Sequence, residues 1–140
     1  MNINKLYFKI KELLFGMIFQ KIRVTRYSCL STINIGGGKL QPVLVNGYGR
    51  VKIGKNVVFG VKSSPYFYSG YSFINARRMD SYIEIGDNCI INNNATIISD
   101  GKRIIFGSKC LIGYNFQVMD SDFHDLNPSN RFSPKNIIKK

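Results

Sequence analysis

Acidic residues and histidine are scarce in this 140-residue chain. Eight Asp and Glu stand against 20 Lys and Arg, which gives a formal net charge of +12 at pH 7, and His124 is the only histidine. One histidine cannot provide a three-histidine zinc site, and no Cys, His and carboxylate cluster has metal-ligand spacing. The sequence therefore predicts no metal centre.

Cysteine and proline are also few. The three cysteines, Cys29, Cys89 and Cys110, have no CxxC spacing. An odd number of cysteines, without a cleavable signal, indicates reduced thiols and a cytoplasmic location. With 44% hydrophobic residues and only four prolines, the chain is expected to form a globular domain rather than a disordered segment.

Long hydrophobic runs are absent. The longest apolar run of the N-terminal segment, "LLFGMIF", has seven residues and is too short to cross a bilayer. Residues 1–25 instead predict an amphipathic basic helix, broadly apolar apart from one narrow polar stripe. The stripe consists of Lys5, Lys9, Glu12, Gly16, Gln20 and Arg23.

Two interpretations of this helix remain open. It could pack across the end or side of the following domain, or lie on an anionic membrane whose lipids its flanking lysines would suit. Nucleic acid is not an expected partner, because no RNP-like aromatic motif, zinc-finger spacing or helix-turn-helix pattern accompanies the positive charge.

From about residue 43 the pattern changes to short β-prone pieces with a period of six. Gly-bearing copies read "IGKNVV", "IGDNCI", "FGSKCL" and "IGYNFQ". Such a period is typical of a parallel β-helix, in which three short faces make one coil of eighteen residues. The expected inward residues are Ile85, Ile91 and Ile97 in one coil and Phe106, Ile112 and Val118 in the next.

The position four residues after each inward apolar residue also turns inward and has room only for a small side chain. Val57, Cys89, Ala95 and Cys110 occupy it, which gives two of the cysteines a packing role. The spacing from Ile85 to Phe106 exceeds one coil by three residues, so residues 99–103 should bulge outward. The aromatic stretch 61–82 is predicted either as a coil with relaxed spacing or as an excursion.

The run "IEIGDNCIINNNATIISDGKRIIFGSKCLIGYNFQVMDSDFHDL" resembles the central coils of the hexapeptide-repeat O-acetyltransferases, which include galactoside and maltose acetyltransferases and enzymes that modify bacterial surface polysaccharides. The resemblance covers residues 43–131. It implies an all-β fold, a left-handed parallel β-helix preceded by the amphipathic α-helix, assembled as a homotrimer. It also implies acetyl-CoA as acyl donor and a sugar or glycan as acceptor.

By this resemblance His124 matches the family's catalytic histidine. Asn94, in "NNNAT", matches an asparagine that contacts the acceptor, and Asp100, in "SDGK", lies near an acidic acceptor contact. The chemistry of the residues agrees, because a thioester is already activated and a neutral imidazole suits proton removal from a sugar hydroxyl near pH 7. Asp122 or Asp125 could orient the imidazole ring, and Arg131 could contact a phosphate or carboxylate.

Relatives usually continue with further coils where this chain ends in "RFSPKNIIKK". Residues 132–140 are therefore predicted as a basic tail or the start of a missing coil. The favoured hypothesis is a cytoplasmic sugar O-acetyltransferase, peripheral at the inner face of the membrane. The alternative is a catalytically inactive or truncated β-helix protein that acts as a membrane-associated binding or scaffold module.

Overall fold

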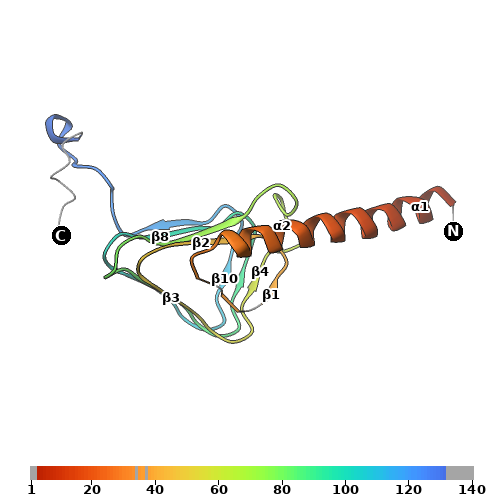
Figure 1. Ribbon diagram of the computed structural model, residues 1–140, viewed down its shortest axis with the longest axis horizontal. Helices are drawn as coiled ribbons and strands as arrows, with labels where there is room; N and C mark the ends of the chain where they lie inside the picture. The colour runs from red at the N-terminus through yellow and green to blue at the C-terminus, as the bar shows by residue number, and fades with distance from the viewer. Residues whose placement is uncertain (1–2, 34, 37, 132–140) are drawn as a thin grey trace.

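The computed structural model describes residues 3–33, 35–36 and 38–131. A long helical segment precedes a stack of coils, and the strands of successive coils form three parallel sheets (Figure 1). The predicted basic segment 132–140 lies outside the described residues. Successive strands enter sheets A, B and C in turn, so every third strand pairs, which is compatible with the parallel β-helix that the repeat predicts.

The strands are short, as expected from a six-residue repeat. Sheet A contains β1 (Gly38–Lys39), β4 (Val58–Phe59), β7 (Ile90–Ile91) and β10 (Leu111–Ile112). Sheet B contains β2 (Val43–Gly47), β5 (Ser72–Ala76), β8 (Thr96–Ser99) and β11 (Gln117–Met119). Sheet C contains β3 (Arg50–Ile53), β6 (Tyr82–Ile85) and β9 (Arg103–Phe106).

The helical segments are α1 (Ile3–Lys11), the π-helical turn η1 (Glu12–Gly16), α2 (Met17–Leu30) and the 3₁₀ turn η2 (Pro128–Asn130). The N-terminal helix thus extends beyond the predicted residue 25. None of the helices in the described part of the chain is both long enough and apolar enough to cross a bilayer.

The core is the interior of the triangular prism, and the predicted inward residues lie in it. Ile85, Ile91 and Ile97 are fully buried. Burial of such a side chain stabilises a fold by roughly 1.5–3 kcal/mol, so stacking equivalent residues coil on coil accumulates stability along the axis. In sheet B the stacked column consists of Val45, Ile74, Ile97 and Val118.

The predicted small inward positions are confirmed. Val57, Cys89 and Ala95 are buried, and Cys110, in the last described coil, is half-buried. Burial raises the pKa of the Cys110 thiol above its ordinary value, which suits a packing role rather than a nucleophilic one.

Tight corners join the sheets. Gly47 shows how close the coils approach at the corner between sheets B and C: its φ is +106°, and an added Cβ would lie 1.9 Å from the carbonyl oxygen of Ala76. No other residue type fits there.

The aromatic stretch is an excursion followed by a regular strand. Residues 61–71 bulge from the corner between sheets A and B, and β5 returns the chain to the coil. The buried side chain of Asn93 fastens the bulge, since its Nδ2 donates to the carbonyl oxygens of Val61 (2.9 Å) and Pro65 (2.7 Å). Tyr71 of the bulge packs against Tyr27 of α2, with 4.8 Å between the ring centroids.

Candidate functional site

The sole histidine lies on an arm, residues 120–131, which leaves the coils after β11 at the corner between sheets B and C (Figure 1). His124 is exposed and has no hydrogen bond to any described residue. Asp122 is exposed as well, and half-buried Asp125 accepts a hydrogen bond from the backbone N–H of Asn127 (2.8 Å). Arg131, at the end of the arm, is exposed.

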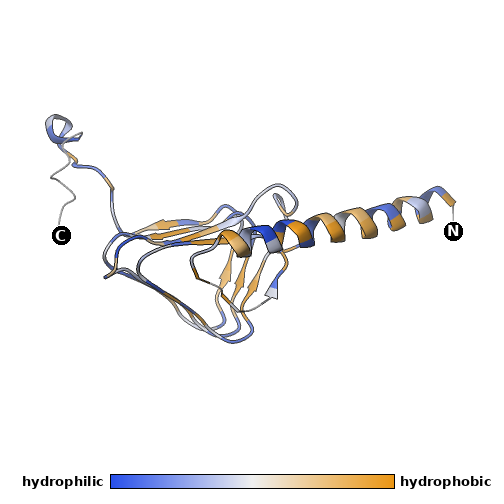
Figure 2. Cartoon of the chain, in the orientation of Figure 1, coloured by the Kyte–Doolittle hydropathy of each residue, from blue (hydrophilic) through white to orange (hydrophobic). Residues whose placement is uncertain are grey.

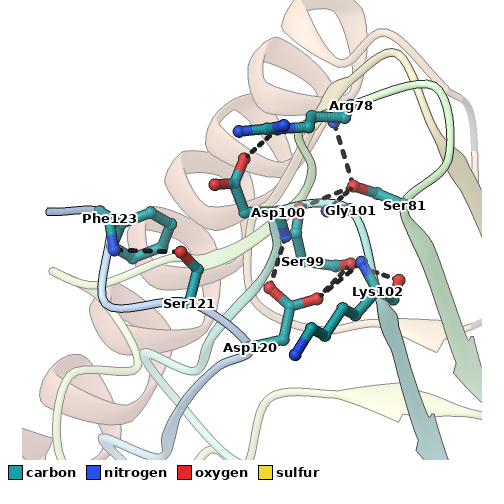
Figure 3. A network of polar contacts seen from close by, with 9 residues as sticks. All are labelled: Arg78, Ser81, Ser99, Asp100, Gly101, Lys102, Asp120, Ser121 and Phe123. Atoms are coloured by element: carbon teal, nitrogen blue, oxygen red, sulfur yellow. Dashed lines mark hydrogen bonds and ion pairs between the residues drawn. The ribbon is translucent and has the colours of Figure 1, made fainter. Parts of the chain in front are cut away.

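A polar network holds the base of this arm (Figure 3). The Asp120 carboxylate accepts hydrogen bonds from the backbone N–H groups of Asp100 (2.6 Å) and Lys102 (3.2 Å) and from the Ser99 hydroxyl (2.7 Å). Asp120 therefore ties the start of the arm to the bulge that precedes β9, and residues 99–103 do form the outward loop that the spacing predicts.

The predicted acceptor contact Asp100 belongs to the same corner. Its side chain is only 5% exposed and pairs with Arg78, with 3.0 Å between Arg78 Nε and Asp100 Oδ1. Ser81 braces the loop from the preceding coil, since its Oγ accepts hydrogen bonds from the N–H groups of Gly101 (2.8 Å) and Arg78 (3.1 Å). Arg78 Nη2 is buried and has no hydrogen-bond partner among the described residues.

The residue before His124 has an unusual backbone conformation. Phe123 has a φ of +59°, which bulky side chains rarely adopt. Its N–H donates to Ser121 Oγ (3.0 Å), and the Arg77 guanidinium lies 4.5 Å from the centre of its ring. These contacts fix the direction in which the arm carries His124 away from the coils.

Asn94 lies elsewhere. It occupies the corner between sheets A and B with a φ of +61°, its Nδ2 donates to Asn115 Oδ1 (2.7 Å), and its N–H donates to Gln41 Oε1 (2.9 Å). Strand β8 runs from this corner to the corner of Asp100, and its four residues span about 13 Å. Within one chain, Asn94 and the His124 arm are thus at opposite ends of sheet B.

Charges on the outer face of sheet C form a separate cluster. Lys52 Nζ lies 2.7 Å from Glu84 Oε1, and the hydrogen bonds from Lys52 and Tyr82 lower the pKa of Glu84 below its ordinary value. This cluster does not involve the arm. Among the described residues, no three His, Cys, Asp or Glu side chains gather as metal ligands.

The repeat pattern did not point to Asp120, Arg78, Ser81 or Phe123. One signal was present for Asp120. Ser99 and Asp120 follow the inward residues Ile97 and Val118 by two positions, where strand alternation again points inward and an apolar side chain would be expected. Two polar residues at such inward-pointing positions indicate a buried polar network at this corner.

Comparison of the chain with family models, with curated proteins and with solved structures found no match.

Proposed function

We propose that the chain is an acyltransferase that moves an acetyl group from acetyl-CoA to a sugar hydroxyl in bacterial surface polysaccharide biosynthesis. The observation that carries the proposal is the position of His124. The only imidazole of the chain is exposed on an arm that leaves a stacked parallel coil, and no described residue occupies its ring nitrogens by a hydrogen bond.

In this proposal His124 is the general base. A neutral ring nitrogen takes the proton of the sugar hydroxyl as its oxygen attacks the thioester carbon. The carbon–sulfur bond then breaks, and the proton passes to the departing thiolate. Asp122 would orient the ring, or Asp125 through the oxygen that does not accept the N–H of Asn127.

A complete site needs a second copy of the chain. Asn94, proposed to bind the acceptor, lies at the opposite end of sheet B from the arm, and His124 is exposed, with no hydrogen bond from the described residues of one copy. We infer left-handed coils that assemble as a homotrimer, with His124 of one copy facing Asn94 of the next. The location that we propose is cytoplasmic, at the inner face of the membrane.

The experiment follows acetyl transfer from acetyl-CoA to a panel of hexoses by mass spectrometry. His124→Ala should lower the rate by about 10²–10⁴-fold, the usual contribution of a positioned acid–base group. Ser129→Ala, an exposed change on the same arm, is the matched control and should keep the rate.

The shared site has its own test. Asn94→Ala should act mainly through acceptor affinity, so the assay is run at low acceptor concentration. When His124→Ala and Asn94→Ala chains are unfolded, mixed in equal amounts and refolded, about a quarter of the interfaces in a random trimer combine both native residues. Recovery of activity in the mixture supports the shared site, and no recovery contradicts it.

A non-catalytic scaffold is the second candidate. It is favoured by the engagement of both proposed acceptor residues, Asn94 with Asn115 and Asp100 with Arg78, in bonds within the chain. Absence of turnover by the native chain with every acceptor would support this alternative. Near-native turnover by His124→Ala would instead show that the chain is an enzyme whose general base is not His124.

A further inference from the structure

The N-terminal helix binds the coils through the α2 end of its polar stripe. Gln20 is buried, and its Nε2 donates to the carbonyl oxygens of Leu40 (2.9 Å) and Phe67 (2.8 Å). Arg23 donates through Nη2 to the carbonyl oxygen of Gly70 (2.7 Å). The side of the helix that would ordinarily face water is therefore the side that is docked.

The apolar side of the helix is left uncovered as a result. Figure 2 shows apolar residues along the whole segment, including the part that projects beyond the coils. None of the residues of α1 is buried. We call the following set the apolar helix face, whose members are between 41 and 81% exposed: Ile3, Leu6, Ile10, Leu13, Leu14, Ile18 and Ile22.

The charges beside this face have one sign. Residues 3–30 contain six basic side chains and one acidic side chain, Glu12. Glu12 Oε1 lies 3.9 Å from Nζ of Lys62, on the bulge from the corner of the coils, so its charge is offset there. The exposed basic residues that remain are Lys5, Lys9, Lys11, Lys21 and Arg26.

We propose that the apolar helix face is a docking surface for an anionic lipid bilayer. The helix lies in the plane of the interface, its apolar side chains enter the boundary between headgroups and acyl chains, and its lysines contact the negative headgroups. The coils, bound to the polar stripe, remain on the aqueous side. This inference is independent of the proposed acetyl transfer.

Charge complementarity favours a bilayer over a second copy of the helix. Two such segments side by side would bring together two strongly positive surfaces, because each has only one acidic residue, Glu12, and that residue already lies beside Lys62. The other seven carboxylates of the chain belong to residues 80–125, in the coils and the arm. An anionic membrane supplies the missing negative charge and also covers the apolar face.

Vesicle flotation with the full chain tests the proposal. The chain should float with vesicles of phosphatidylcholine containing one third phosphatidylglycerol, and binding should weaken as salt rises or when phosphatidylcholine is used alone. Ile18→Glu/Ile22→Glu should lower binding by roughly tenfold or more, because two apolar side chains that would enter the acyl-chain boundary are replaced by charged ones. Tyr48→Glu/Met79→Glu adds the same two negative charges at residues of the coils that are 85 and 87% exposed, and this charge-matched control should bind as the native chain does.

A second variant separates the lysines from the fold of the helix. Lys11→Gln/Lys21→Gln keeps helix propensity and should weaken binding to anionic vesicles by about 25-fold, a factor of about five for each lysine near the surface. Flotation that is absent in the native chain, or equal in the native chain and both double variants, overturns the proposal. It is also overturned if Ile18→Glu/Ile22→Glu dissociates an oligomer in the absence of lipid, because the face then covers a second copy.

Discussion

Asp120 is the residue on which the geometry of the arm depends most. Its carboxylate gathers two backbone N–H groups and one hydroxyl, and these donors come from the bulge of the preceding coil. A carboxylate can accept several such bonds at once, whereas an amide of the same size turns one of its two polar atoms into a donor. The position therefore favours aspartate over asparagine.

We expect Asp120→Asn to lower the free energy of unfolding by about 1–3 kcal/mol, because the NH₂ that replaces one carboxylate oxygen cannot accept the donors that this oxygen accepts. Urea denaturation measures the difference. Asp122→Asn, two residues along the arm at an exposed position, should stay within about 0.5 kcal/mol of the native chain. Equal stability of the two variants would show that the corner network contributes nothing to the fold.

At the scale of the elements, the corners decide how strands follow one another. At the corner between sheets A and C, Asn56, Asn88 and Lys109 adopt φ values of +54°, +58° and +62°. Asn56 Nδ2 donates to Asn88 Oδ1 (3.1 Å), so the first two coils share an amide ladder. The third coil places a lysine where asparagine tolerates the left-handed conformation better.

Lys109→Asn should accordingly raise the free energy of unfolding by about 0.5–1 kcal/mol, because it removes backbone strain. Thermal or urea denaturation detects a change of this size. Lys55→Asn makes the same replacement beside Asn56, at a residue without positive φ, and no comparable gain is expected there. If both replacements stabilise equally, the gain comes from reduced positive charge and not from the backbone.

On the scale of the whole molecule, the outer face of sheet A offers a surface for assembly. Val58, Ile90 and Leu111 are in register on neighbouring strands, and Leu111 is 79% exposed. An apolar column of this kind on a flat sheet face is typical of an interface between subunits. It is independent of the apolar helix face, which lies on another element.

Sedimentation equilibrium should therefore give about three times the 15.9 kDa mass of the chain, in keeping with the proposed homotrimer. Leu111→Glu should shift the equilibrium toward monomer, since it places a charge in the column. Ile105→Glu, at a 55% exposed position on sheet C, should leave the oligomer intact. A native chain that is monomeric at micromolar concentration would contradict both the trimer and the shared site.

Much of the parallel coil arrangement could be predicted from the linear pattern of residues. The six-residue period predicted which side chains point inward, including the small residues Val57, Cys89 and Ala95, and it predicted the outward loop at residues 99–103. These features depend on neighbours within a few residues and on one repeated spacing, so a linear pattern contains them. It also identified His124, because the chain has no other imidazole.

Contacts between distant parts of the chain could not be predicted from the linear pattern. The side of the N-terminal helix that docks is fixed by the carbonyl oxygens of Leu40, Phe67 and Gly70, which Gln20 and Arg23 reach across more than one coil. Hydropathy alone favours burial of the apolar side, since it takes no account of backbone acceptors contributed by another part of the chain. The separation of Asn94 from His124 is fixed in the same way, because the stacking of coils sets which corner each residue occupies.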